Sequence, residues 1–208
     1  MTYEPTSYSY IVRGQCSSNT GSGSSSMHVS INNVKVSFSI KPFPLSHYKY
    51  VQRNLPKAAI RKEHGNFTVI RYDNLVISVF SSGFINLTGI KSLNNVRKAW
   101  KKTCRHVLHS PSRYSTPFSI DNISASGTWP PIRNNFFRPL SPDFITTTSN
   151  NIKSVKYNNQ RFPGMFLKTS IGGVIIVYKS GNFVIVGSRS TTSITHTKEI
   201  IKNVYPRA

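Results

Sequence analysis

The side chains that could do chemistry in this sequence are few and lie far apart. Lys and Arg together number 27, whereas Asp and Glu number only 6. A two-metal nuclease needs clustered carboxylates, and no two of these acids are close in the sequence. Cys104 and His106 fall two residues apart on an expected helix, so they point in different directions and do not form a thiol–imidazole pair. We therefore expect no enzymatic activity, no metal, no cofactor and no small-molecule substrate.

The excess of positive charge indicates a polyanionic partner. The formal net charge is +21 at pH 7, and a chain this basic would repel itself without such a partner. Nucleic acid is the first candidate, an acidic membrane surface is the second, and a basic protein without a polyanionic partner is the third. The sequence has no uninterrupted apolar run of roughly 18 residues, so we expect no membrane span. Cys16 and Cys104 have no CxxC neighbour, which argues against a zinc site or a disulfide framework.

The elements that must position the basic side chains form an internal repeat. Residues 76–92 read VISVFSSGFINLTGIKS, residues 174–190 read VIIVYKSGNFVIVGSRS, and the two segments align without a gap. In each copy a β-branched run enters a Ser-Gly turn and continues as a second strand that ends at a glycine. The identical pairs are Val76/Val174, Ile77/Ile175, Val79/Val177, Ser82/Ser180, Gly83/Gly181, Gly89/Gly187 and Ser92/Ser190. Each copy therefore predicts a β-hairpin.

A segment with helical spacing follows each predicted hairpin. In residues 93–108 the apolar face consists of Val96, Ala99, Trp100, Thr103 and Val107. The opposite side carries Arg97, Lys98, Lys101, Lys102 and Arg105. In residues 191–205 one face can hold Ile194, Ile201, Val204 and Tyr205, although the segment is rich in Thr, a weak helix former. Both hairpins are thus expected to run into a helix.

The segments upstream of the hairpins also correspond. SINNVKVSFSI (30–40) is similar to FSIDNISASGT (118–128), which matches Asn33 to Asn122. HGNFTVIRY (64–72) precedes the first hairpin as FPGMFLKTS (162–170) precedes the second. Each half therefore predicts a strand, a helix or loop, three strands and a helix, with only short helices fitting in the Pro-interrupted stretches LPKAAIRK and PPIRNNFFRPLSPDF.

Two similar units in one chain predict an α+β fold with pseudo-twofold symmetry. Their strands can join into one curved antiparallel sheet with helices on one face, which leaves the other face for a ligand. We expect a flexible tail and linker in residues 1–26, because residues 17–26 read SSNTGSGSSS, a first repeat in residues 27–110 and a second repeat in residues 111–208.

The ordered set of motifs resembles the TATA-box-binding protein family. SVFSSGFINLTGIKS is similar to the family hairpin IFxSGKxVxTGAKS, and IIVYKSGNFVIVGSRS with the later IKNVYP is similar to its second-repeat counterpart. RFPGMFLK resembles LFPGLIYR, FSIDNIS resembles FKIQNIV, and PPIR resembles FPIR. The resemblance covers about residues 27–208 and implies a ten-stranded saddle with helices on the convex face and DNA on the concave face.

Family positions imply a set of DNA-binding residues in this chain. Those at or near the centre of the DNA site are Asn33, Lys35, Ser78, Asn86, Thr88, Asn122, Ser124, Ile176, Val184 and Val186. Phosphate contacts are implied for Arg71, Lys91, Lys168 and Arg189, whereas Phe84 and Asn182 replace family lysines. The aromatic wedges are Phe80, Phe162 and Tyr178. The fourth wedge position falls at His64 by direct offset or near Phe67 if the alignment slips, and a His64 wedge would kink the first-repeat end less sharply.

The resemblance implies a transcription initiation factor that binds and bends A·T-rich duplex DNA in the nucleus, or at a site of viral transcription. General transcription factors or the RNA polymerase machinery are the implied protein partners. The segment KYNNQRFPG lacks the acidic residues that help family members recruit the B-type general factor, and this divergence favours a viral or protist source. The alternative is a basic, DNA-condensing structural protein that keeps the fold without promoter specificity.

Overall fold

The fold is seen in a computed structural model that describes residues 27–57, 59–109, 117–128, 150–158 and 160–204. The tail expected in residues 1–26 and the second Pro-interrupted stretch lie outside these ranges, as does Tyr205. The elements of the first repeat are β1 (His28–Ser39), α1 (Leu45–Arg53), β2 (Ile60–His64), β3 (Phe67–Tyr72), β4 (Leu75–Phe80), β5 (Phe84–Ile90) and α2 (Val96–Lys102). Those of the second repeat are β6 (Phe118–Thr128), β7 (Ile152–Lys156), β8 (Gly164–Thr169), β9 (Val174–Tyr178), β10 (Asn182–Ser188) and α4 (Thr191–Val204).

The strands form one ten-stranded antiparallel sheet whose order is symmetric about its centre. The order is β2-β3-β4-β5-β1-β6-β10-β9-β8-β7, so β1 and β6 are the central pair and each repeat continues outward from one of them. β1 pairs with β6 from His28↔Thr128 to Phe38↔Phe118. The expected pseudo-twofold α+β fold is therefore confirmed.

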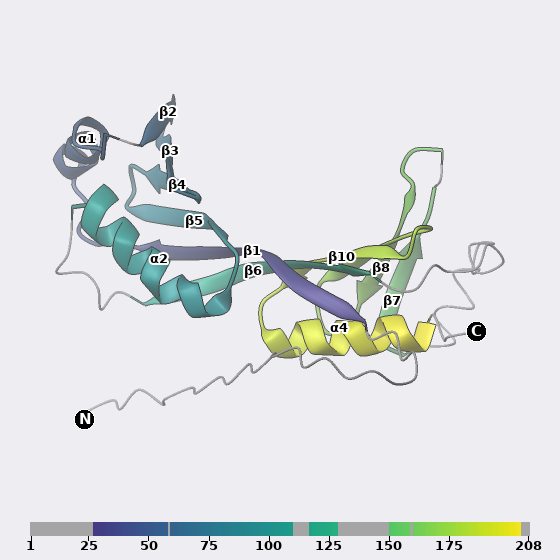
Figure 1. Ribbon diagram of the computed structural model, residues 1–208. Coiled ribbons are helices and arrows are strands. Elements are labelled where there is room, and N and C mark those ends of the chain that lie inside the picture. The colour runs from purple at the N-terminus through teal and green to yellow at the C-terminus, as the bar shows by residue number, and fades with distance from the viewer. Residues whose placement is uncertain (1–26, 58, 110–116, 129–149, 159, 205–208) are drawn as a thin grey trace, which may run out of the picture.

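Helices cover one face of the sheet and leave the other open. α2 and α4 lie beneath the sheet, and the two ends of the sheet rise on the opposite side, as in a saddle (Figure 1). Alternate strand residues such as Ile77, Ile85, Ile175 and Ile185 are buried in the core between sheet and helices. Their neighbours on the same strands are half-exposed and point to the other side, because successive side chains of a strand alternate. We call that side the open face.

The helix after the first hairpin has the predicted faces. Its five expected apolar-face residues are all buried, and Phe38 of β1 packs edge-on against Trp100 at 6.5 Å between ring centroids. Beyond Lys102 the helix continues as a π-helical turn over Thr103–Val107. Lys102 forms an ion pair with Asp73, which ties the helix to the turn between β3 and β4. The Thr-rich segment is also a helix, since burial of Ile194, Ile200, Ile201 and Val204 outweighs its weak propensity.

Each repeat has four strands after its first helix or loop, not the three predicted from the residue pattern. The additional strands are β2 and β7, at the two edges of the sheet. All five residues of β2 are exposed. Its sequence therefore lacks the alternation of apolar and polar residues that predicts a half-buried strand. The helix of the first half is α1, which ends before LPKAAIRK; that stretch instead leads into β2.

Gly89, at the end of the first hairpin, requires both a left-handed backbone and empty space. Its φ is +92°, and an added Cβ would lie 2.1 Å from the Asn74 carbonyl oxygen. Gly172 has a φ of +88° but no heavy atom within 4 Å of an added Cβ. Gly172→Ala thus isolates the backbone cost, about 1–2 kcal/mol, from the steric one.

We expect Gly89→Ala to lower the free energy of unfolding by about 1–3 kcal/mol more than Gly172→Ala does, because only the former overpacks the sheet. Urea denaturation of both variants and the wild type measures this difference. Equal losses in the two variants would contradict the close approach of β5 to the turn after β3.

Candidate nucleic-acid interface

The open face presents the side chains that the family resemblance placed at the centre of a DNA site. Asn86 and Val184 lie at equivalent positions of β5 and β10, and their neighbours Ile85 and Ile185 face the core. All ten residues of that expected set are half-exposed, and those on the two hairpins are Ser78, Asn86, Thr88, Ile176, Val184 and Val186. The hairpins therefore bring all six to one surface.

The paired amides of the two repeats are held by identical backbone bonds. The Gly89 N–H donates to Asn33 Oδ1 at 2.7 Å, and the Gly187 N–H donates to Asn122 Oδ1 at 2.6 Å. Strand pairing shifts register beside both bonds, between Val34 and Val36 of β1 and between Ile185 and Ser188 of β10. Each amide thus satisfies an N–H that the irregular ladder leaves unpaired.

These bonds also orient the amides. Because Oδ1 of each amide accepts a backbone N–H, the other end of the group is a donor. Asn33 lies opposite Ser124 across the central strand pair, and Asn122 lies opposite Lys35. Asn122 Nδ2 donates one hydrogen bond to Ser124 Oγ at 3.2 Å, which leaves its second N–H to donate elsewhere. Two amide donor groups therefore lie on either side of the pseudo-twofold axis, on half-exposed side chains.

A carboxylate that the sequence reasoning did not single out lies beside this centre. Asp121 Oδ1 accepts hydrogen bonds from Ser37 Oγ at 2.9 Å and Ser119 Oγ at 3.1 Å, and its other oxygen is 3.9 Å from Lys35 Nζ. Asp121 precedes Asn122 just as Asn32 precedes Asn33, so the repeat itself could have drawn attention to it. Lys35 and the two hydroxyls offset part of the negative charge of Asp121.

The two halves of the open face differ in polarity. In the first repeat, one row across the strands runs Val69–Ser78–Asn86–Ser37. The equivalent row of the second repeat runs Phe166–Ile176–Val184–Ser126. The first row is polar at three of its four positions, whereas the second is apolar at three of its four.

Aromatic rings gather at the first-repeat end of the open face. Phe67 and Phe80 are paired across β3 and β4 and stack at 5.1 Å between ring centroids. His64 stacks on Phe67 at 5.1 Å, and Phe84 contacts Phe80 at 5.8 Å. Phe84, expected only as the replacement of a lysine, thus joins a cluster of four rings.

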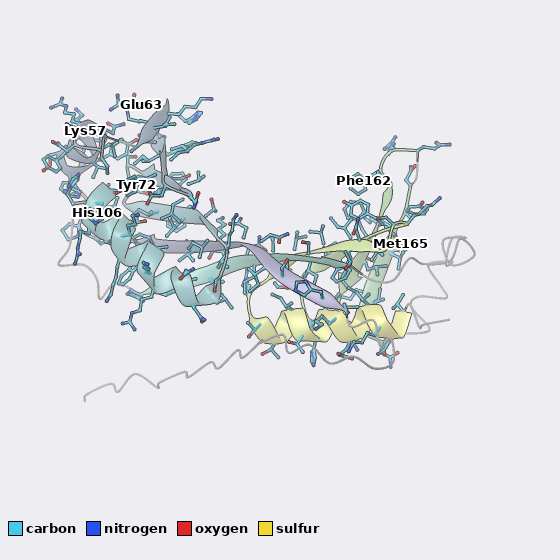
Figure 2. The ribbon with its side chains drawn as sticks, viewed as in Figure 1. Lys57, Glu63, Tyr72, His106, Phe162 and Met165 are labelled. Atoms are coloured by element: carbon cyan, nitrogen blue, oxygen red, sulfur yellow. The ribbon has the colours of Figure 1, made fainter. Side chains whose placement is uncertain are left out.

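A second cluster lies at the other end. The Phe162 ring is 6.0 Å from Tyr178 and 5.1 Å from Phe166. Figure 2 shows Phe162 on the side of the sheet away from α4. Gly164 makes room for this ring, because a Cβ there would lie 2.7 Å from Phe162 Cε1. The ring thus fills the space above a glycine opposite Tyr178.

Strand register corrects the alignment of the wedge positions. Across the strands, Phe67 pairs with Phe80 and Gly164 pairs with Tyr178. Phe80 and Tyr178 are 98 residues apart in the sequence, whereas Phe67 and Gly164 are 97 apart. The direct offset that matched His64 to Phe162 is therefore wrong for this strand. Phe67 of the first repeat is therefore equivalent to Gly164 of the second repeat. The space beside Gly164 is filled by the ring of Phe162.

The basic residues expected to contact phosphate are all exposed. Arg71 lies opposite Val76 and Lys168 opposite Val174, so the two are equivalent in register. Lys91 and Arg189 follow the last strands of the two hairpins at the same spacing. These four cations flank the open face in symmetric pairs.

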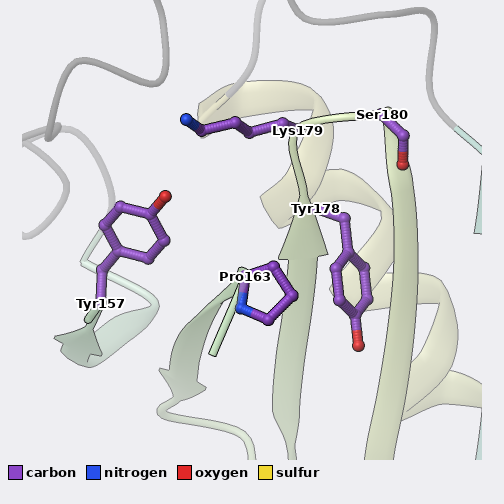
Figure 3. Close-up of a pocket in the computed structure, with 5 residues that line it drawn as sticks. All are labelled: Tyr157, Pro163, Tyr178, Lys179 and Ser180. Carbon is purple, nitrogen blue, oxygen red and sulfur yellow. The ribbon is translucent and has the colours of Figure 1, made fainter. Parts of the chain in front are cut away.

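Groups that could support catalysis are not assembled in the described residues. Burial raises the pKa of the Cys104 thiol to about 12, so it is not a nucleophile. The described ranges hold no group of three His, Cys, Asp or Glu that could bind a metal, and no helix within them is long and apolar enough to cross a membrane. A pocket of about 450 Å³ near the second aromatic cluster is lined by Tyr157, Pro163, Tyr178, Lys179 and Ser180 (Figure 3), none of which is an acid, a thiol or an imidazole.

Comparison with known proteins agrees with this geometry. The family model described as "Transcription factor TFIID (or TATA-binding protein, TBP)" matches residues 28–109 and 136–207. The solved structure of Methanococcus jannaschii TBP is 21% identical, with a TM-score of 0.60 over 85% of this chain and 97% of that one. A rolling circle replication initiator protein from Geobacillus stearothermophilus is 10% identical over 86% of this chain and 80% of that one, but its TM-score is only 0.37. No curated protein sequence matches the chain.

The family model covers well over half of the chain, in two segments that correspond to the two repeats. The archaeal structure has the same fold. The chain therefore belongs to the TATA-binding protein family of DNA-binding transcription factors, a family of non-enzymatic proteins.

Proposed function

We propose that this protein binds A·T-rich duplex DNA through the minor groove and bends it to initiate transcription. The observation that carries the proposal is the symmetric pair of amides, each fixed through its oxygen by the glycine N–H that ends a hairpin. They lie on β1 and β6, the central pair of strands. The described helices leave one face of this sheet open (Figure 1).

The amides have the chemistry that an A·T minor groove requires. That groove offers only acceptors, adenine N3 and thymine O2. With Oδ1 of Asn33 and Asn122 already bonded to backbone, each amide has its NH₂ group to donate. Ile176, Val184 and Val186 form a half-exposed apolar surface beside them, and such a surface is typical of a face that a partner covers.

The aromatic clusters support bending. Minor-groove proteins, this family among them, insert apolar wedges between base steps and kink the duplex. Each end of the open face has an aromatic pair, Phe67 with Phe80 at one end and Phe162 with Tyr178 at the other. The expected weaker kink at the first-repeat end depended on His64 as the wedge, whereas Phe67 lies closer to Phe80 in register.

Transcription partners and location follow from the family rather than from a site in this chain. We propose that the protein acts in the nucleus, or where viral genes are transcribed, with general transcription factors or RNA polymerase machinery. The exposed basic residues of α2, among them Arg97, Lys98 and Lys101, offer one surface for such a partner or for flanking DNA.

The proposal is tested first by comparing A·T-rich and G·C-rich duplexes at about 150 mM salt, roughly the physiological ionic strength. We expect tighter binding to the A·T-rich duplex, with a log–log salt slope of about −0.9 for each phosphate neutralised. Fluorescence anisotropy titrations measure both quantities. Equal affinity for the two duplexes would contradict the proposal and would favour the DNA-condensing alternative.

A second prediction separates the two roles of the amides. Asn33→Asp and Asn122→Asp keep an oxygen for the glycine N–H but replace the donor with a carboxylate. Each should weaken binding to the A·T-rich site by about 1–3 kcal/mol while the melting temperature stays near that of the wild type. Asn33→Ala, which also loses the backbone bond, should weaken both binding and stability. Normal site binding by both Asp variants would mean that the amides act only within the fold.

A third prediction concerns the wedge at the first-repeat end. Phe67→Ala should reduce base unstacking at that end of the site more than His64→Ala does, because Phe67 stacks directly on Phe80. A fluorescent adenine analogue placed at each end step reports unstacking separately, and Phe162→Ala is the matched control for the opposite end. A larger effect of His64→Ala than of Phe67→Ala would reverse this assignment.

A further inference from the structure

We propose that the first-repeat half of the open face accepts a guanine-bearing base pair through Asn86, while the second-repeat half requires A·T pairs. The proposal rests on the minor-groove binding proposed above and adds to it the base pair that each half selects. It also gives the protein one preferred orientation on an asymmetric site.

Asn86 has an unpaired acceptor in the middle of the polar row. Its Oδ1 atom is buried, and none of the described residues donates to it, although the residue as a whole is half-exposed. The neighbouring hydroxyl of Ser37, directly across the strand pair, already donates to Asp121 at 2.9 Å. A carbonyl left without a donor is costly, so a ligand that brings a donor to it gains free energy.

Acceptors are concentrated around Asn86. Asp121 supplies a carboxylate, and its hydrogen bonds to Ser37 and Ser119 place it in the same half of the face. Ser78 lies opposite Asn86 across β4 and β5, and its hydroxyl oxygen is a further acceptor. At Ser78 and Asn86 this half therefore has oxygen atoms where the other half has the aliphatic side chains of Ile176 and Val184.

The minor groove has one kind of donor with which such oxygens can pair. It is the 2-amino group of guanine, since A·T pairs present only acceptors there. An acceptor on this face thus gains a partner from a G·C pair and none from an A·T pair. Because Asn86 Oδ1 is buried, the proposed contact requires the amide to rotate about its Cβ–Cγ bond when DNA binds.

The equivalent position in the second repeat has the opposite chemistry. Val184 lies 98 residues after Asn86 and pairs with Ile176, where Asn86 pairs with Ser78. A guanine amino group pressed against these side chains would lose its water without gaining an acceptor. The two halves therefore differ in their response to the same chemical group.

The test adds that group one base at a time. In a duplex carrying a site selected from random sequence, 2,6-diaminopurine replaces each adenine in turn, which adds the minor-groove amino group and keeps the pairing partner thymine. The variants are Asn86→Val and Val184→Asn, which exchange the two side chains between the halves. Binding is measured by anisotropy, and thermal melting of each variant checks its folding.

With the wild type, we expect the added amino group to be neutral or favourable in one half of the site and to weaken binding about tenfold at the symmetric position. Asn86→Val should make both halves intolerant, and Val184→Asn should make both tolerant. Inosine, which lacks the amino group, should reverse any preference for guanine.

Each contrary result has its own meaning. Equal penalties in both halves of the wild-type complex, or a tolerance that Asn86→Val leaves unchanged, would overturn the role of Asn86 while leaving minor-groove binding intact. Binding that shows no sequence preference in any duplex would instead overturn the proposed function, and the assignment of Asn86 with it.

Discussion

The pairing of β1 with β6 is the interaction on which the rest of this structure depends. Each repeat alone would have a sheet of five strands with an unpaired edge at its longest strand. Joining the two edges removes that exposed ladder and makes one continuous surface. It also brings Asn33 and Asn122 to the centre, where neither repeat could place two amides by itself.

The strand pairs at the centre of the sheet contain register shifts, and these shifts help to position the two amides. Register shifts in β1–β6 and in the pairs beside it leave glycine N–H groups out of the regular ladder. The two amide oxygens satisfy those groups, so the bulges and the oriented donors are parts of one arrangement. Asn33 and Asn122 thus have a structural role and a proposed binding role at once, carried by opposite ends of one side-chain group.

Symmetry of the backbone does not extend to the chemistry of the open face. The hairpins, the helices that follow them and the flanking cations repeat, but Ser78 and Asn86 are polar where Ile176 and Val184 are apolar. Under the base preference proposed above for Asn86 and Val184, a backbone with two equivalent halves would bind an asymmetric site in one orientation.

Much of this architecture could be predicted from the sequence, and the exceptions have physical causes. The hairpins and the helix beginning at Val96 carry strong periodicities because each buries one face. β2 does not, since all its residues are exposed. The match of Asn33 to Asn122 came from the repeat, whereas their glycine partners depend on pairing register, which no local pattern encodes. The gapless alignment matched His64 to Phe162, whereas the strand register matches Phe67 to Gly164.

Inosine·cytosine pairs test most directly whether the open face binds the minor groove, as proposed. Such a pair presents the minor-groove acceptors of an A·T pair but the major-groove pattern of a G·C pair. Replacing the A·T pairs of the selected site with inosine·cytosine pairs should leave the dissociation constant within about threefold, a change of less than about 0.7 kcal/mol. A loss of affinity as large as that caused by G·C pairs would place recognition outside the minor groove and contradict the account.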